Sequence, residues 1–401
     1  MTMKYITGCR AAAEGARVCK VHTVAAYPIT PQTGIVESLA HFVAEGELPA
    51  QMVPVESEHS AMSATVGAAM VGARAFTASS SQGLALMHEC LFMASGLRLP
   101  IVMPVANRSL ASPVTIFCDH QDSLPQRDTG WLQLYAENCQ EVLDSIILGY
   151  KVAEDERVLL PLMVCFDGFY VSHISEPVDI PDQGQVDAYL GPHTVRYPIL
   201  DIDNPKVFNV MPFPPYFEEF QRDKHESALA ALEVFEEAFA AFGTRFGRLY
   251  HNVETHRTED ADYVFLGLGS MMGTAREAVD RLRARGHRVG VAKIKTYRPF
   301  PVDQVVAAVR GAKVIGILDR DISFGSGGIV FQDVTRALYN CPDRPLALNF
   351  IVGLGGRDVT LKTLERCFFE MEEASGAAAV SNPVRWPDAN SELIKAWGVN
   401  W

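Results

Sequence analysis

Short apolar runs alternate with helical patterns over the first half of the chain. Each run is rich in β-branched or small apolar residues and stops near a turn or a polar cluster, which is typical of buried strands. The candidate strands are His22–Ala26, Ala73–Ala78, Pro100–Ala106 and Leu159–Phe166. Strands that alternate with helices predict βαβ units built around a parallel sheet.

Residues 60–73 form a predicted helix that is rich in small side chains. Ser60, Ala64, Ala68 and Gly72 are four residues apart and therefore lie on one face of it. Such a face lets another element approach closely. The pattern leaves open whether that element belongs to the same domain or to another subunit.

The character of the chain changes over residues 195–222, where prolines interrupt a stretch rich in Phe and Tyr. The prolines are Pro198, Pro205, Pro212, Pro214 and Pro215. We expect a linker that wraps the surface, with no regular helix at Pro214–Pro215. A helix should follow, with Leu232, Phe235, Phe239 and Phe242 on its apolar face and Gly243 as its end.

A second α/β unit is predicted after this helix. Its strands are Tyr263–Leu268, Val289–Lys293 and Val314–Leu318, and its helices are Met272–Arg285 and Val302–Val309. Residues 373–401, which include Trp401, read as a tail that docks or frays. The predicted organisation is a first domain over 1–194, a linker and connecting helix over 195–257, a second domain over 258–372 and a tail over 373–401.

Composition narrows the function classes. The 401 residues include 48 acidic and 35 basic side chains, giving a net charge of -13, and no patch of Lys and Arg is suited to phosphates. We therefore expect no nucleic-acid partner. No window is apolar enough to span a membrane, and the first eight residues lack the apolar core of a signal peptide, so we expect a cytoplasmic protein.

The eight cysteines are scattered singly, and no Cys-x-x-Cys occurs. The chain therefore lacks the ligand runs of an iron–sulfur protein, and any electrons released in a reaction must be carried by another chain. A different class is suggested by Gly267-x-Gly269-x-x-x-Gly273, which lies between a predicted strand and a predicted helix. It approaches a nicotinamide-dinucleotide fingerprint, although its third glycine is misplaced and such turns often need glycine for packing alone.

Polar loops follow several strands of the first unit. Thr30 lies between two prolines directly after a strand, and Glu58 precedes the small-residue helix. Ser79–Gly83 and Asn107–Arg108 end two further strands. Because ligands bind outside the carboxyl ends of parallel strands, these loops predict a ligand site. The run Asp119-His120-Gln121-Asp122 reads as a hydrogen-bonded loop, since its spacing does not match a metal site, and we assign no metal ligand to this chain.

Several motifs in a fixed order resemble the alpha chain of the 2-oxoacid:ferredoxin oxidoreductase family, the pyruvate type in particular. They are Tyr27-Pro-Ile-Thr-Pro-Gln-Thr33, Glu56-Ser-Glu-His-Ser-Ala-Met62, Ser80-Ser-Gln-Gly-Leu-Ala-Leu-Met-His-Glu89, Ala106-Asn-Arg108, Asp119-His-Gln-Asp122, Gln126-Arg-Asp-Thr-Gly-Trp131, Thr296-Tyr-Arg-Pro-Phe-Pro301 and Gly353-Leu-Gly-Gly356. The resemblance implies a pyrimidine-binding thiamine diphosphate domain followed by a transketolase C-terminal-like α/β domain.

The resemblance also implies roles for individual residues. Glu58 would be the catalytic carboxylate that contacts the aminopyrimidine of thiamine diphosphate, and Thr30 and Arg108 would hold the carboxylate of the substrate. The remaining residues implied to contact the cofactor are Pro28, Ile29, Ser81, Gln82 and Gly83.

Partner chains are implied as well. The chain contains no Gly-Asp-Gly run of the kind that holds the diphosphate and Mg²⁺ in thiamine enzymes, so a beta chain should complete the shared site. Gamma and ferredoxin-like delta chains, or their equivalents, would carry [4Fe-4S] clusters and pass electrons to ferredoxin or another acceptor. Coenzyme A would be the co-substrate, and the isolated chain should be inactive.

The substrate is less closely defined by the resemblance. Thr30 favours an ordinary 2-oxo acid over oxalate. However, Ile116-Phe117-Cys118 stands where pyruvate enzymes tend to have a Trp-Asn pair, so an aryl or branched 2-oxo acid such as phenylglyoxylate is an alternative to pyruvate. A nicotinamide-dependent dehydrogenase and a non-catalytic assembly subunit remain the competing hypotheses.

Overall fold

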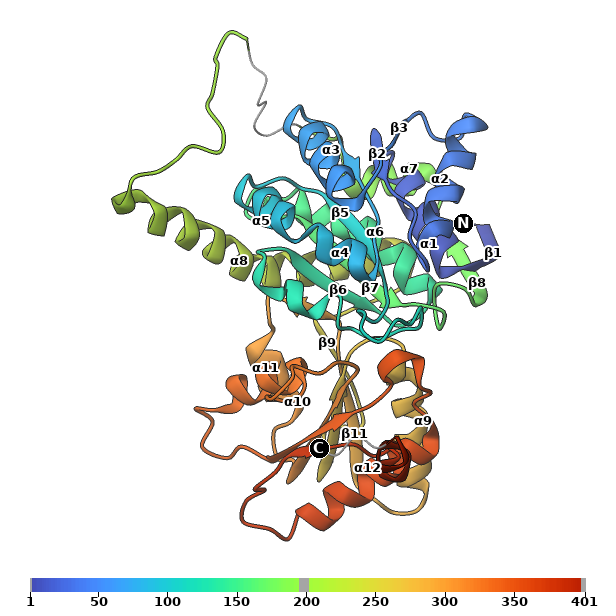
Figure 1. Cartoon of the computed structure of the whole chain (residues 1–401), viewed down its shortest axis with the longest axis vertical. Coiled ribbons are helices and arrows are strands. Elements are labelled where there is room, and N and C mark those ends of the chain that lie inside the picture. The colour runs from blue at the N-terminus through green and yellow to red at the C-terminus, as the bar shows by residue number, and fades with distance from the viewer. Residues whose placement is uncertain (1, 195–201, 398–401) are drawn as a thin grey trace. The chain divides into compact units, whose positions relative to one another are not determined.

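The computed structural model describes residues 2–194 and 202–397, which divide into two compact units (Figure 1). The first unit comprises the described residues up to Glu254, together with Leu268–Ser270 and Ile294–Gln304. The second comprises Thr255–Gly267, Met271–Lys293 and the described residues from Val305 onward. The domain boundaries at 194, 257 and 372 stay predictions.

A seven-stranded sheet forms the centre of the first unit, in the order β12-β6-β7-β5-β4-β2-β3. Its strands are β2 (Thr23–Ala26), β3 (Gln51–Pro54), β4 (Ala75–Phe76), β5 (Val102–Asn107), β6 (Leu132–Ala136), β7 (Leu162–Asp167) and β12 (Thr296–Arg298). All neighbours pair in parallel except β12, which is antiparallel to β6. The four strands predicted in this unit are confirmed as β2, β4, β5 and β7.

Helices surround this sheet. They are α1 (Gly8–Val18), α2 (Thr33–Ala44), α3 (Glu58–Met70), α4 (Ser81–Leu86), α5 (His88–Gly96), α6 (Cys139–Ala153), α7 (Gln183–Leu190) and α8 (Pro214–Phe246), with a 3₁₀ turn at Leu124–Asp128. Separately, β1 (Thr2–Thr7) pairs antiparallel with β8 (Ser175–Ile180). Because α6 packs between neighbours, most of its residues are buried, including polar Asp144 and Ser145.

The helix α8 corrects two predictions. It begins at Pro214, although a proline pair was expected to exclude helix there. The first turn of a helix uses none of its own N–H groups, so prolines fit at its start. It also continues through Gly243 and ends at Gly247, whose φ of 74° is left-handed. Gly243 is instead a packing position, since a Cβ there would lie 3.1 Å from Leu249 Cδ1.

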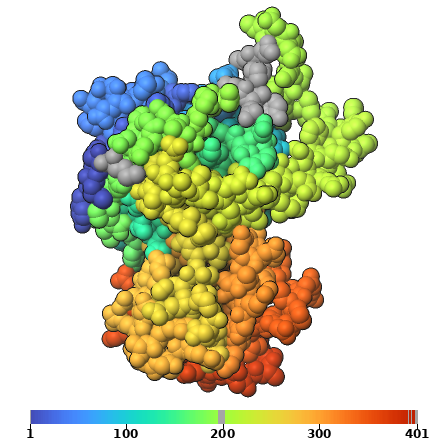
Figure 2. Space-filling view, turned by 180° about the vertical axis from the view of Figure 1, so that it is seen from behind, coloured from blue at the N-terminus to red at the C-terminus, as the bar shows by residue number. Residues whose placement is uncertain are grey.

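The N-terminal part of α8 stands away from the body of the first unit, as the yellow-green side chains in Figure 2 show. Tyr216, Phe217 and Phe220 are 61%, 55% and 56% exposed. Residues 202–213 form no helix or strand, as the prolines predicted, but Ile202 is 96% exposed and Met211 is 89% exposed. The wrapping of this segment over the surface stays a prediction; Pro198 lies outside the described residues.

The second unit contains a six-stranded sheet in the order β15-β14-β13-β10-β11-β9. The strands are β9 (Val253–His256), β10 (Tyr263–Gly267), β11 (Val289–Ile294), β13 (Val314–Asp319), β14 (Leu346–Ile351) and β15 (Val384–Arg385). The helices are α9 (Met271–Ala284), α10 (Val302–Ala308), α11 (Ile329–Leu338), α12 (Leu361–Ala374) and α13 (Ser391–Ala396), with a 3₁₀ turn at Leu354–Gly356. The strands and helices predicted for this half are confirmed within a few residues at their ends.

Part of the predicted tail docks on this sheet. Val384 pairs in parallel with Asn349 of β14, and Thr363 Oγ1 donates a 2.9 Å hydrogen bond to Asp388. The segment is therefore integrated into the edge of the second unit up to this point, while Trp401 lies outside the described residues.

Close packing accounts for two glycines of the second unit. A Cβ at Gly267 would lie 2.7 Å from Met272 Sδ, and one at Gly328 would lie 2.1 Å from the Asp319 carboxyl. Asp319 is fully buried and accepts hydrogen bonds from the amides of Val330 and Phe331 at the start of α11. Close packing thus accounts for Gly267, the first glycine of the pattern that approached a dinucleotide fingerprint.

Candidate active site

Thr30 lies in the loop that follows β2, with its residue exposed. Gln32, which is fully buried, holds this loop in place. Its Nε2 donates hydrogen bonds to Tyr27 O at 2.8 Å and to Ala78 O at 3.3 Å. These bonds join the ends of two strand segments of the sheet, and leave the Thr30 side chain at its carboxyl edge. Pro28 is exposed and Ile29 is partly exposed in the same loop.

Arg108 follows β5 and reaches the same loop. Its Nη1 donates a 3.1 Å hydrogen bond to Thr30 O, and its Nε donates a 2.9 Å bond to Thr115 O. The structure therefore brings together the two residues that the resemblance assigned to the substrate carboxylate. A guanidinium beside a hydroxyl-bearing residue is suited to binding a carboxylate.

Glu58 is the first residue of α3, where Ser57 caps the helix by accepting a 3.2 Å bond from Ser60 N. Its side chain lies against Gly83 at the start of α4, since a Cβ on Gly83 would lie 2.5 Å from Glu58 Oε1. The residue is only 7% exposed. No described residue donates a hydrogen bond to its carboxyl group.

Ser81 has a left-handed backbone, with φ of 50°. Its amide donates to Asp122 Oδ2 at 2.9 Å, and its hydroxyl donates to Ser109 O at 2.6 Å and contacts Gln82. Left-handed conformations are uncommon outside glycine and persist where surrounding contacts hold them, frequently in functional sites. The Ser81–Gly83 segment is thus tied to the loop that carries Arg108.

Asp122 connects the Ser81–Gly83 segment to the loop that carries Arg108. The sequence predicted for it only a place in a hydrogen-bonded loop. Asp122 is fully buried and accepts bonds from the amides of Ser81 and Arg108, from Asn107 Nδ2 and from Ser123 N. Burial raises the pKa of Asp122 to about 6, although these hydrogen bonds act in the opposite direction. The sequence marked Asp122 only as a carboxylate in a run of polar residues. Its hydrogen-bond donors could not be predicted, because the folded sheet brings them to it.

His120 has a different partner from the one suggested by its neighbours in sequence. Its Nε2 lies 2.7 Å from Asp167 Oδ1 at the end of β7, and both side chains are buried. Cys118 Sγ is 3.5 Å from the same oxygen. Asp167 also accepts a 3.0 Å bond from Ser270 N. These contacts form a buried cluster that ties the loop to the end of β7, whereas the sequence predicted hydrogen bonds within the Asp119–Asp122 run.

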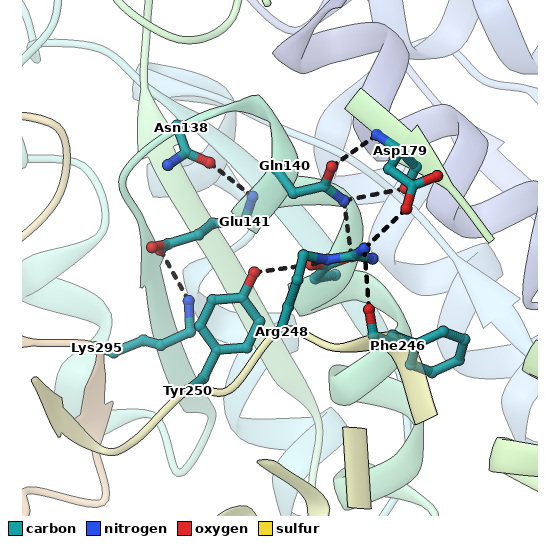
Figure 3. A network of polar contacts seen from close by, with 9 residues as sticks. Asn138, Gln140, Glu141, Asp179, Phe246, Arg248, Tyr250 and Lys295 are labelled. Atoms are coloured by element: carbon teal, nitrogen blue, oxygen red, sulfur yellow. Dashed lines mark hydrogen bonds and ion pairs between the residues drawn. The ribbon is translucent and has the colours of Figure 1, made fainter. Parts of the chain in front are cut away.

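A second polar network lies on α6 and does not involve the candidate site residues (Figure 3). Asp144 accepts bonds from Arg248 Nε at 2.6 Å and from Tyr250 Oη at 2.7 Å, and Lys295 Nζ lies 2.9 Å from Glu141 Oε2. Burial raises the pKa of Asp144, opposed by Arg248. Because these charged side chains pair with one another, we interpret the network as one that stabilises the fold.

The residues present fit the aminopyrimidine of a thiamine cofactor. The Glu58 carboxyl has no hydrogen-bond donor among the described residues, which leaves it available to accept one from a bound group. Two buried atoms at the same strand ends, Gln32 Oε1 and Asn107 Oδ1, have no hydrogen-bond partner among those residues. Glu58, Ser81, Gln82 and Gly83 adjoin one another at α3 and α4, as the motifs implied, whereas their contact with a cofactor stays a prediction.

Two family models match the chain. The model described as "Pyruvate flavodoxin/ferredoxin oxidoreductase, thiamine diP-bdg" covers residues 14–240. The model described as "Pyruvate:ferredoxin oxidoreductase core domain II" covers residues 261–364.

Similar proteins agree with these matches. The chain is 50% identical over 384 residues to the pyruvate synthase subunit PorA of Pyrococcus horikoshii, covering 96% of this chain and 97% of that protein. It is 46% identical over 384 residues to the ketoisovalerate oxidoreductase subunit VorA of the same organism, with the same coverage. The PorA subunit of Methanothermobacter thermautotrophicus is 47% identical over 365 residues, covering 91% and 94% of the two chains.

One solved structure shares the fold. It is the 2-oxoglutarate:ferredoxin oxidoreductase from Magnetococcus marinus with 2-oxoglutarate, coenzyme A and succinyl-CoA bound, which matches with a TM-score of 0.72 at 20% identity. The match covers 92% of this chain, and this chain spans 65% of the length of that one.

The fold, the arrangement at the strand ends and the family match define an α/β protein with a thiamine-diphosphate-binding domain. Its sheets are mainly parallel, as the sequence predicted. The chain belongs to the pyruvate flavodoxin/ferredoxin oxidoreductase family and is a 2-oxoacid:ferredoxin oxidoreductase subunit. None of its described helices combines the length and apolar character that crossing a membrane requires.

Proposed function

We propose that this chain is the alpha subunit of an enzyme that oxidatively decarboxylates a 2-oxo acid to acyl-CoA and CO₂. The observation that carries the proposal is the placement of Arg108 beside Thr30, with the unpartnered Glu58 carboxyl at the same edge of the sheet. Arg108 and Thr30 can hold the carboxylate of the substrate, and Glu58 can hold the aminopyrimidine ring of the cofactor. Oxidative decarboxylation of a 2-oxo acid needs both contacts.

Arg108 and Thr30 would orient the acid through its carboxylate, by guanidinium and hydroxyl respectively. When bound, thiamine diphosphate supplies the nucleophile and the electron sink that let the bond between the carboxylate carbon and the keto carbon break. Glu58 would share a proton with a ring nitrogen of the aminopyrimidine. Pro28, Ile29 and the Ser81–Gly83 segment would shape the rest of this half of the cofactor site.

We assign the other half of the site to partner chains. A beta chain would hold the diphosphate and Mg²⁺, and gamma and delta chains or their equivalents would carry [4Fe-4S] clusters. The electron pair released from the acid would pass through them to ferredoxin or another acceptor, while the sulfur of coenzyme A takes the acyl group. The names of the PorA relatives, which are subunits of pyruvate synthase, support this composition.

We place the enzyme in the cytoplasm. All eight cysteines are free thiols, and all but Cys341 are buried. Scattered free thiols are typical of a reducing compartment.

Pyruvate is the first substrate that we propose, and a branched or aryl 2-oxo acid such as phenylglyoxylate is the second. Ile116 and Phe117 are 42% and 49% exposed and directly follow Thr115, whose carbonyl group receives the Arg108 bond. Phe117 also packs against Phe169, with ring centroids 5.3 Å apart. These apolar side chains offer a wall for a substrate side chain larger than methyl, which supports testing the larger acids.

The test is acyl-CoA formation by the reconstituted complex with pyruvate, 2-ketoisovalerate and phenylglyoxylate. Glu58→Ala and Arg108→Ala should each abolish most turnover, because they remove the cofactor carboxylate and the substrate guanidinium. Glu56→Gln is the matched control, since Glu56 is exposed and its carboxyl accepts a hydrogen bond from Ser60 at the same helix start. Activity that persists in both alanine variants would refute the assigned roles.

The competing functions give different results in the same experiment. A nicotinamide-dependent dehydrogenase would bind NAD tightly as an isolated chain, which calorimetry would detect. A non-catalytic assembly subunit would leave turnover unchanged in Glu58→Ala and Arg108→Ala.

Phe117→Ala should lower kcat/KM for the preferred larger acid by about tenfold relative to pyruvate if the apolar wall contacts the substrate side chain.

A further inference from the structure

One carboxylate oxygen joins the two loops of the candidate site. Asp122 Oδ2 accepts a 2.9 Å bond from Ser81 N and a 2.9 Å bond from Arg108 N. The first amide belongs to the segment assigned to the cofactor, and the second belongs to the residue assigned to the substrate. Because both donors meet a single atom, the two loops are fixed relative to each other through it.

The other oxygen holds Asp122 itself in place. Oδ1 accepts a 2.8 Å bond from Asn107 Nδ2 and a 2.8 Å bond from Ser123 N. The side chain is fully buried, so no water competes for these bonds. A buried carboxylate with four N–H donors is held in one orientation, which makes it a fixed reference point for both loops.

The Arg108 side chain depends on this backbone anchor. The residue is partly exposed, and its guanidinium is held by two carbonyl groups, Thr30 O and Thr115 O, that lie on loops. A guanidinium that must meet a carboxylate in a two-bond geometry tolerates little displacement. A shift of the Arg108 backbone would therefore move the guanidinium away from Thr30.

We propose that Asp122 is a positioning residue for substrate binding, which sets the Arg108 guanidinium against Thr30 by holding the Ser81 and Arg108 amides on one oxygen. It does not touch the substrate. This inference rests on the proposed role of Arg108 in binding the acid, and it adds a residue that acts through Arg108.

The experiment compares Asp122→Ala and Asp122→Asn in the reconstituted complex. Asp122→Ala removes both acceptors and should raise KM for the 2-oxo acid on the order of tenfold or more, with kcat and KM for coenzyme A changed far less. Asp122→Asn keeps one oxygen for the two amides but turns its NH₂ group toward two donors, Asn107 Nδ2 and Ser123 N, so it should restore only part of the affinity for the acid. Hydrogen exchange should be faster at the amides of Ser81 and Arg108 in Asp122→Ala.

Asp144→Ala is the matched control, because Asp144 is an equally buried aspartate of the same unit that bonds to Arg248 and Tyr250. It should lower thermal stability without a selective change in KM for the acid. The proposal is overturned if Asp144→Ala gives the same KM change, if Asp122→Ala lowers kcat alone, or if exchange at the two amides is unaltered. A wild-type complex without turnover on any 2-oxo acid would instead overturn the proposed function, and the exchange measurement would still decide whether Asp122 holds the two loops.

Discussion

A buried carboxylate such as Asp122 is costly to ionise, and its four N–H donors offset that cost only in part. The pKa of Asp122 is raised to about 6 by burial. Between about pH 4 and pH 6 the folded chain therefore keeps a proton that the unfolded chain has released. The free energy of unfolding contains a contribution that falls as the pH rises through this window.

The Asp122→Asn variant tests this pH dependence. An amide does not titrate, so wild type should lose stability relative to the variant by ~3 kcal/mol between about pH 4 and pH 7. Urea unfolding of the chain at several pH values measures the difference. A stability difference that stays constant over this range would show that the pKa of Asp122 is not raised.

Gly83 is a second residue whose identity follows from a close contact. A Cβ there would lie 2.5 Å from Glu58 Oε1, well inside contact distance. Gly83→Ala should therefore displace the Glu58 carboxyl and lower turnover of the complex by at least about tenfold. Gly184→Ala in α7 is the control, since a Cβ there meets nothing within 4 Å. Equal activity in the two variants would contradict the assigned contact.

At the scale of elements, α8 has two halves of different character. Its second half buries Phe235, Phe239 and Phe242 in the core of the first unit, whereas Phe217 and Phe220 in its first half are more than half exposed. The periodicity of the apolar residues located the buried half correctly. The first half also contains aromatic residues, but their side chains are exposed. The hydrophobic pattern alone therefore did not distinguish the two halves of the helix.

This contrast predicts different costs for the same substitution along one helix. Phe242 is fully buried, with ring centroids 4.4 Å from Phe246 and 5.4 Å from Tyr189. Phe242→Ala should lower the free energy of unfolding by about 3–5 kcal/mol. Phe220→Ala should change it by less than about 0.5 kcal/mol. Denaturant unfolding of the isolated chain compares the two variants, and similar losses would contradict the burial pattern.

On the scale of the whole molecule, we expect the chain to supply one half of a shared reaction centre. No residue in the described part of the chain donates a hydrogen bond to the Glu58 carboxyl, and the sequence has no Gly-Asp-Gly run to hold a diphosphate. We expect the isolated chain to bind thiamine diphosphate weakly and to show no turnover. Addition of the partner chains should restore both, which calorimetry and acyl-CoA formation would measure. Turnover by the isolated chain would contradict a shared site.

Much of the fold could be predicted because its signals are local. Apolar runs located β2, β5, β7, β10, β11 and β13, and polar residues directly after the strands located Thr30 and Arg108. Short or weakly apolar strands such as β3 and β6 were not singled out, since their pattern does not differ from that of a loop or helix segment. The start of α8 was misjudged because a proline pair ends a helix in its interior but begins one at its N-terminus.

The sequence by itself determined the alternation of strands and helices, the absence of a basic or membrane-spanning stretch, and the order of motifs that marks the family. These are properties of residue order, and they persist without long-range contacts. Only the tertiary structure decided that Arg108 reaches Thr30, that Glu58 lies against Gly83, and that Asp122 joins the Ser81 and Arg108 amides. The contacts of Arg108 with Thr30, of Glu58 with Gly83 and of Asp122 with Ser81 join loops that follow different strands of the parallel sheet, so their geometry exists only after the strands have paired.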